Sequence, residues 1–261
     1  MKFLVSQKIL PSTLMVIVAL LAWEGLVRST KIPPYVLPAP SDIFASLIQD
    51  GGSLYHALLV TLRICFIALS IATLGAISLA ILFVQSIWIE RALLPLAVVL
   101  QVTPIIAIAP LLLIYLPNTE WALIICAAII AFFPILANTA QGLVSVDPSH
   151  MDLFRLYKAS RWQVLWWLQF PTALPHIMTG LRIAGGLALI GAVAAEFVAG
   201  SAGVGSGLAW RLIEAGYRLE IPRMFAALFL LAATGIAIYA GFSGLTWLVL
   251  HRWHEPIRRN S

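Results

Sequence analysis

Charged residues are scarce in this chain: they occupy only 10% of its 261 positions, whereas hydrophobic residues occupy 61%. The mean hydropathy of +0.98 lies far outside the range of soluble domains. Cysteine is rare as well, and Cys65 and Cys126 both fall inside long apolar runs, so they imply no disulfide and no redox role. The sequence shows neither a soluble domain nor a repeat of fixed period. These absences indicate an all-α membrane protein.

Six apolar segments are candidates to cross the hydrocarbon, which takes about 20 residues. Four contain uncharged runs longer than this, the first carries Glu24, and the fifth carries Arg182 and Glu196. The first has a basic start like a signal peptide but no cleavage site before a soluble domain, so we expect it to be retained. The predicted spans are residues 11–27, 58–86, 92–116, 120–143, 176–199 and 224–250, in one transmembrane domain over residues 1–261.

Lysine and arginine are distributed unequally between the two predicted sides of the membrane, and the richer side is expected to be cytoplasmic. The richer set is Lys2, Lys8, Arg91, Arg155, Lys158, Arg161, Arg252, Arg258 and Arg259. Both termini and the loop at about 147–175 are therefore predicted to be cytoplasmic. The net charge of +5 is explained by basic residues beside anionic headgroups and requires no nucleic acid.

Several residues are candidates for a gate or pathway. Pro104 and Pro110 make a straight third span improbable, and broken helices at membrane depth are tolerated where they line protein or water, although proline is also common in membrane helices generally. Glu196 is costly near membrane depth unless paired or hydrated, and a position at the external headgroups is an equal alternative. Gly203 and Gly205 permit a sharp external turn. Short external helices are expected after a Ser41 N-cap and over 208–216.

A row of small residues in the fifth predicted span recurs every four positions: Gly180, Ala184, Ala188 and Ala192. Small side chains let another helix approach closely. This row predicts a helix-packing seam. We favour a seam between helices of one chain over a seam between two copies of the chain.

The segment Asp152–Pro175 is too charged for a span and too apolar for a plain loop. On a helical wheel, Leu153, Leu156, Tyr157 and Ser160 occupy one half, and Asp152, Arg155, Lys158 and Arg161 occupy the other. Pro171 and Pro175 are expected to end the returning segment. This pattern predicts a short cytoplasmic helix at the membrane surface, with lipid or a protein as its partner.

A loop motif of Glu-Ala-Ala, a glycine and a Leu-Pro has its counterpart here in Asp152-Leu153-Phe154, Lys158 and Leu174-Pro175. Through these residues the chain resembles the permease subunits of binding-protein-dependent ABC importers. Further matches are Leu37-Pro38-Ala39-Pro40, Thr61-Leu62-Arg63, Gly180-Leu181-Arg182, and Glu196 followed by Gly203 to Gly207. They are most similar to the branch importing sulfonates, taurine, nitrate or bicarbonate, and thiamine-related pyrimidines.

The resemblance implies a type I importer permease fold in a bacterial inner membrane, a second permease copy, two ATP-binding subunits and an external solute-binding protein. The cytoplasmic helix would couple to the ATPase through Asp152, Leu153, Phe154, Arg155, Leu156, Lys158, Ala159, Ser160, Arg161 and Pro171. ATP and Mg²⁺ would bind the partner and no cofactor this chain. Lys158 departs from the family glycine, so a left-handed backbone there would cost roughly 1 kcal/mol unless the turn differs.

Other functions are weighed against this one. The glycine-rich run 200–207 lacks the Lys-Ser or Lys-Thr and the preceding strand of a phosphate loop. Ser243 lies in a GxSG like that of intramembrane proteases, but no histidine follows on a later span, and we expect the hydroxyl to bond within its own helix. His251, His254 and Glu255 make an incomplete metal site. A secondary transporter or channel remains an alternative, although neither repeated halves nor midplane charges are visible.

Overall fold

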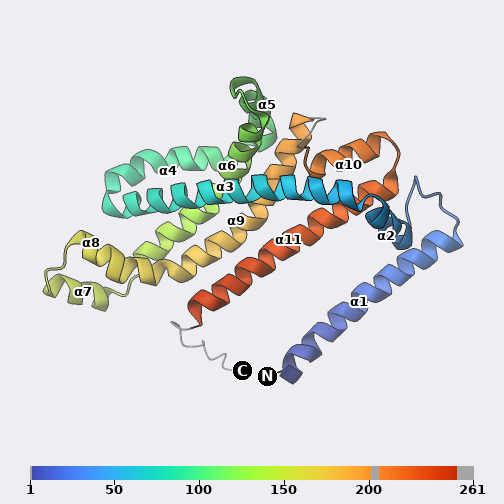
Figure 1. Cartoon of the computed structure of the whole chain (residues 1–261). Coiled ribbons are helices and arrows are strands. Elements are labelled where there is room, and N and C mark those ends of the chain that lie inside the picture. Colours follow the sequence, from blue (N-terminus) through green and yellow to red (C-terminus); the bar gives the residue numbers. More distant parts are fainter. Residues whose placement is uncertain (1, 201–205, 252–261) are drawn as a thin grey trace. The chain divides into compact units, whose positions relative to one another are not determined.

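The structure is a computed structural model that describes residues 2–200 and 206–251. Every regular element in these residues is a helix (Figure 1). The chain divides into two compact units, residues 1–59 with 202–232 and residues 60–201 with 233–261. Two long helices, α3 (Gly51–Gln85) and α11 (Ile221–Leu250), contribute to both units.

The first unit also contains α1 (Lys2–Ser29), α2 (Pro40–Gln49) and α10 (Leu208–Tyr217). Its core is formed by Ile43 of α2, Leu54 of α3, Leu208 of α10 and Ala226 of α11. Trp23 of α1 packs beside this cluster. The short helix expected over 208–216 is therefore present as α10.

The N-terminus of α2 corrects one expectation. Ala39, and not Ser41, is the N-cap residue, and the side chain of Asp42 accepts the Ala39 N–H at 3.2 Å. Ser41 lies inside the first turn, where its N–H and hydroxyl donate to the Glu24 carboxylate of α1 at 3.0 and 2.7 Å. Pro40 starts the helix at a position that needs no N–H donor. A carboxylate from another helix thus accepts an N–H of the first turn of α2 that has no partner within the helix.

The second unit contains α4 (Ile87–Val102), α5 (Ile105–Tyr115), α6 (Thr119–Val144), α7 (Pro148–Leu156), α8 (Arg161–Val164), the π-helix η1 (Leu165–Gln169) and α9 (Phe170–Ala199). The helices α6 and α9 make its main interface. At Gly180 of α9, an added Cβ would lie 3.1 Å from the Pro134 carbonyl oxygen and 3.2 Å from Ile135 Cα, both in α6. Ala184, Ala188 and Ala192 are fully buried. The predicted seam thus lies inside the second unit.

Among the described residues, four helical segments are long and apolar enough to cross a membrane: Gly51–Gln85, Thr119–Val144, Arg161–Ala199 and Ile221–Leu250. A fifth span results if α4 and α5, which are bent by 100° at their junction, count as one. The junction lies at Thr103 and Pro104, within the segment that the sequence predicted not to be straight. The first predicted span falls within α1. The six-span count, the cytoplasmic termini and the single domain stay predictions.

Candidate functional site

The segment with the most unusual sequence pattern folds as a helical hairpin, formed by α7, the turn at residues 157–160 and α8 (Figure 1). Its first helix is started by Asp147, whose side chain accepts the Ser149 N–H at 2.8 Å, and by Pro148 at the first helical position. The Ser149 hydroxyl also donates to the Asp147 carboxylate. This hydrogen bond, and to a smaller extent that of the Ser149 N–H, holds the pKa of the Asp147 carboxyl below its usual value. The start of α7 is therefore encoded locally.

The end of α7 is a Schellman motif with lysine where glycine is usual. Lys158 has a φ of 51°, in the left-handed region. The N–H of Lys158 donates to the Arg155 carbonyl at 2.9 Å, and the N–H of Ala159 donates to the Phe154 carbonyl at 3.0 Å. Of the two alternatives at this departure from the family pattern, the structure has the left-handed backbone.

The next helix begins two residues later with a capping box. The Ser160 hydroxyl accepts the Gln163 N–H at 3.3 Å, and the Gln163 side chain accepts the Ser160 N–H at 2.7 Å. The helical-wheel prediction, which placed Lys158 and Ser160 on the same helix as Leu153, is therefore wrong, because α7 ends at Leu156. The Ser-x-x-Gln signature is readable in the sequence and predicts this second start.

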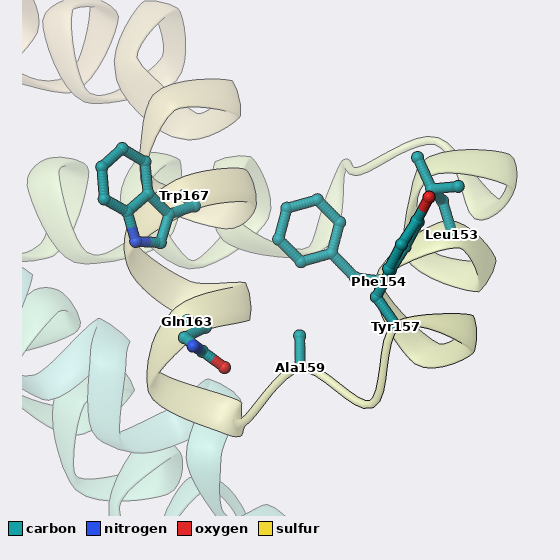
Figure 2. A pocket seen from close by; sticks show the side chains of 6 residues that line it. All are labelled: Leu153, Phe154, Tyr157, Ala159, Gln163 and Trp167. Carbon is teal, nitrogen blue, oxygen red and sulfur yellow. The ribbon is translucent and has the colours of Figure 1, made fainter.

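An apolar groove of about 510 Å³ opens between the two arms of the hairpin. Figure 2 shows the Phe154 ring pointing from α7 into the space between the arms, in the direction of Trp167. Leu153 and Tyr157 line the same groove. Leu156 and Tyr157 are each 78% exposed. A helix with this much exposed apolar surface requires a partner, lipid or protein.

Some charged side chains of the hairpin have an ionic or capping partner, and others have no such partner within the described residues. Asp152 pairs with Arg155 at 3.1 Å, and both side chains are exposed, so this pair contributes little stability. Asp147 is occupied in capping α7. Within the described part of the chain, Lys158 and Arg161 have no carboxylate partner. The exposed surface of the hairpin is therefore apolar and cationic.

A second groove, of about 570 Å³, lies between the hairpin and the end of α3. Val84 and Gln85 of α3 line it together with Met151, Arg155 and Arg161. The hairpin thus lies beside the end of α3, and its second arm continues into α9.

The returning arm of the hairpin is one continuous helical segment from Arg161 to Ala199, through α8, η1 and α9. The expectation that Pro171 and Pro175 end this arm is wrong: Pro171 lies in the first turn of α9 and Pro175 lies inside the helix. The wider π-turn just before Pro171, where the Phe170 N–H donates to the Leu165 carbonyl, gives room for a ring that would clash with an α-helical carbonyl. The 39 residues extend about 58 Å at about 1.5 Å per residue.

The far end of this rod holds the buried carboxyl of Glu196, which is 3% exposed. The Thr61 hydroxyl of α3 donates to Glu196 Oε1 at 2.9 Å. One turn of α3 is thus tied to two neighbours, because Arg63 pairs with Glu120 of α6 at 3.0 Å. Glu196 is therefore buried within the protein and hydrogen-bonded to Thr61, and its depth in the membrane stays a prediction.

The remaining candidates are placed as follows. Pro104 precedes α5 at the bent junction, and Pro110 lies inside α5. Gly203, Gly205, His254 and Glu255 lie outside the described residues. The buried Ser243 hydroxyl has no hydrogen-bond partner among the described residues, so the expected bond to its own helix is absent. Arg182 lies 5.7 Å from the Tyr239 ring centroid. The structure brings together the loop residues 152–161, but it does not bring Pro171 to them as part of a loop.

Comparisons with known proteins follow the same direction. Residues 53–249 match the family described as "Binding-protein-dependent transport system inner membrane component". The formylaminopyrimidine transport permease protein ThiX of Halalkalibacterium halodurans is 32% identical over 94% of this chain and 96% of that protein. The riboflavin transport system permease protein RibX of Chloroflexus aurantiacus is 32% identical over 94% and 89%.

More distant proteins extend the comparison. The taurine transport system permease protein TauC of Escherichia coli is 28% identical over 92% of this chain and 88% of that protein. A crystal structure of an amino acid ABC transporter with histidines covers 80% of this chain and 98% of its own, with a TM-score of 0.65 at 19% identity. That likeness shows a shared fold alone.

Proposed function

Because this chain belongs to the family of inner-membrane components of binding-protein-dependent transport systems, and is the permease subunit of an ABC importer, we propose that its α7–α8 hairpin is the element that couples it to ATP hydrolysis. The observation that carries this proposal is the exposed apolar tip of α7, with Leu156 and Tyr157 each 78% exposed. The chain has no nucleotide-binding motif of its own, so hydrolysis belongs to a separate partner chain.

The assembly we propose has two copies of this permease, two cytoplasmic ATPase subunits that bind ATP and Mg²⁺, and an external solute-binding protein. The permease crosses a bacterial inner membrane six times with both termini in the cytoplasm. Support for this orientation comes from the excess of lysine and arginine on the hairpin side. The hairpin then faces the compartment that contains ATP.

The proposed mechanism is alternating access. Closure of the ATPase pair draws the two hairpins together, and the helix continuous from Arg161 to Ala199 transmits the displacement along its length. Its far end is joined to α3 through Glu196 and Thr61, so α3 is moved with it. The bent junction at Pro104 separates α4 from α5 and allows these two halves to move unequally. Pro104, Pro110 and Glu196 are the pathway or gate residues in this proposal.

The proposed solute is a small molecule of the class named for the relatives: a pyrimidine precursor, a flavin, nitrate, taurine or another sulfonate. The two full-length relatives at 32% identity are named for nitrogen heterocycles. A formylaminopyrimidine and riboflavin are therefore the first solutes to assay, with the external binding protein supplying most of the selection.

The test is ATP hydrolysis and uptake by the reconstituted complex. Leu156→Asp, at the hairpin tip, is expected to abolish solute-stimulated hydrolysis and uptake, because it places a charge where an apolar contact is needed. Tyr217→Asp, a control at an equally exposed position of α10 (84% exposed), is expected to leave ATP hydrolysis unchanged. Uptake that proceeds without ATP would favour a secondary transporter and refute the proposal, as would full coupling in Leu156→Asp.

A further inference from the structure

Lys158 combines three features at the tip of the hairpin. Its backbone is left-handed, with a φ of 51°, a conformation that a side chain with a Cβ adopts at a cost and glycine adopts freely. Its side chain is exposed. It also has no carboxylate partner within the described ranges. Backbone strain of this kind is maintained where another interaction compensates for it.

Strain alone does not distinguish this residue, because Lys31 and Leu219 are also left-handed. After each of them the next residue donates its N–H back to the preceding helix, Ile32 to the Val27 carbonyl and Glu220 to the Ala215 carbonyl. Leu219 also donates its own N–H to the Gly216 carbonyl, which reproduces both hydrogen bonds of the turn at Lys158. What sets Lys158 apart is its place beside the apolar groove of the coupling hairpin. Leu219 therefore supplies a matched control for the backbone effect.

The charges around Lys158 indicate the chemistry of its partner. Both carboxylates of the hairpin are engaged, Asp152 with Arg155 and Asp147 with the N-terminus of α7. Lys158 and Arg161 therefore present an uncompensated positive charge on either side of Ala159, which lines both grooves. A partner surface that binds the exposed apolar side chains of α7 would lie close to Lys158 and Arg161. Cations at the rim of that surface would repel these two residues, and carboxylates there would attract them.

We propose that Lys158, assisted by Arg161, pairs with carboxylates on the rim of an apolar groove in the ATPase subunit and so selects the ATPase with which this permease assembles. This inference rests on the proposed function of the hairpin. Apolar contacts of Phe154, Leu156 and Tyr157 are non-directional and discriminate weakly between grooves, whereas the position of a charge favours a partner with carboxylates at the matching place. The left-handed turn places the lysine at the tip, where glycine would offer no charge.

The proposal predicts effects of opposite sign for one substitution. Lys158→Gly removes the left-handed strain and is expected to raise the Tm of the purified permease by a few degrees. The same change is expected to weaken binding to the purified ATPase subunit about 5- to 20-fold, with a shallower dependence on salt. Leu219→Gly should raise the Tm in the same way and leave ATPase affinity unchanged. A simple folding defect predicts neither pattern.

Charge variants complete the experiment. Lys158→Arg is expected to retain wild-type affinity, and Lys158→Glu is expected to bind more weakly than Lys158→Gly, because it adds repulsion. A lysine in place of the ATPase rim carboxylate should restore binding to Lys158→Glu. Failure of every such exchange to restore binding would overturn the pairing.

The measurement is made with full-length permease in nanodiscs, once in phosphatidylcholine and once with phosphatidylglycerol added. The proposal requires the loss in Lys158→Gly to persist in phosphatidylcholine. A loss seen only with phosphatidylglycerol would assign the lysine to anionic lipid and overturn the proposal. Wild-type affinity in Lys158→Gly, alongside lost binding in Leu156→Asp, would overturn the role of Lys158 alone. Unchanged binding in both variants would overturn the coupling function itself.

Discussion

Replacing Gly142 of α6 with alanine tests the packing on which the second unit depends. A Cβ at this position would lie 2.7 Å from His176 Cβ and 3.0 Å from both Cα and Cβ of Ala173. These atoms are fixed to the backbone of α9 and cannot rotate away. Because carbon atoms in contact lie about 3.5–4.0 Å apart, α6 and α9 must separate by about 1 Å. Overpacking of this kind costs about 1–3 kcal/mol.

Alanine also has a higher helix propensity than glycine by about 1 kcal/mol, which opposes this cost. Gly186 of α9 measures that gain alone, since an added Cβ there meets nothing within 4 Å. We expect Gly142→Ala to lower the free energy of unfolding by about 1–2 kcal/mol and Gly186→Ala to raise it by up to about 1 kcal/mol. Thermal or denaturant unfolding of the detergent-purified permease measures both. Equal stability of the two variants would refute the close approach of α6 and α9.

Three further outcomes are expected. Thr61→Val should lower the free energy of unfolding by about 1–3 kcal/mol, because it removes a buried hydrogen bond to Glu196. Thermal unfolding should show that Thr61→Ser, which keeps the hydroxyl, retains the wild-type stability. Wild-type stability in Thr61→Val would contradict the contact. Ser160→Ala should cost the hairpin about 1 kcal/mol and speed limited proteolysis there about fivefold, and an unchanged cleavage rate would argue against the capping box. The hydrogen bond from Arg211 lowers the pKa of Glu214 below its usual 4.5. The ionised Glu214 carboxylate therefore stabilises α10 above about pH 4.5, and this stabilisation is lost as the pH falls through the lowered pKa. Unfolding measured as a function of pH should show the loss in the wild type and not in Glu214→Gln.

The sequence was sufficient where the signal is local or strongly apolar. The long uncharged runs predict α3, α6 and α11 because an apolar stretch of this length in lipid must satisfy its backbone internally. The prolines around Pro104 predict that the third segment is not straight, and the structure bends by 100° there. At Lys158 the sequence is compatible with a left-handed backbone or with another turn, and the structure has the left-handed one.

The sequence failed where a distant group or an irregular turn decides the outcome. Ser41 looks like an N-cap, but Glu24, seventeen residues earlier, accepts its N–H and hydroxyl. Pro171 and Pro175 look like helix ends, but Pro171 lies in the first turn of α9 just after the π-turn of η1, Pro175 lies inside α9, and the helix continues through both. The partners of Thr61 and Arg63 lie on other helices, and spacing along the chain does not reveal them. The end of α7 at Leu156 was missed although Ser160 and Gln163 carry its signal.

The central claim is that the α7–α8 hairpin seats in a separate ATPase at the cytoplasmic face. Its most direct test is photocrosslinking from Leu156→Cys labelled in membrane vesicles, since Cys65 and Cys126 are both buried and will react poorly. The account predicts that the cysteine is labelled from the cytoplasmic side only and forms an adduct with the co-expressed ATPase subunit, in a yield that changes on addition of ATP. Labelling from the external side, or an ATPase that is never captured there, would contradict it.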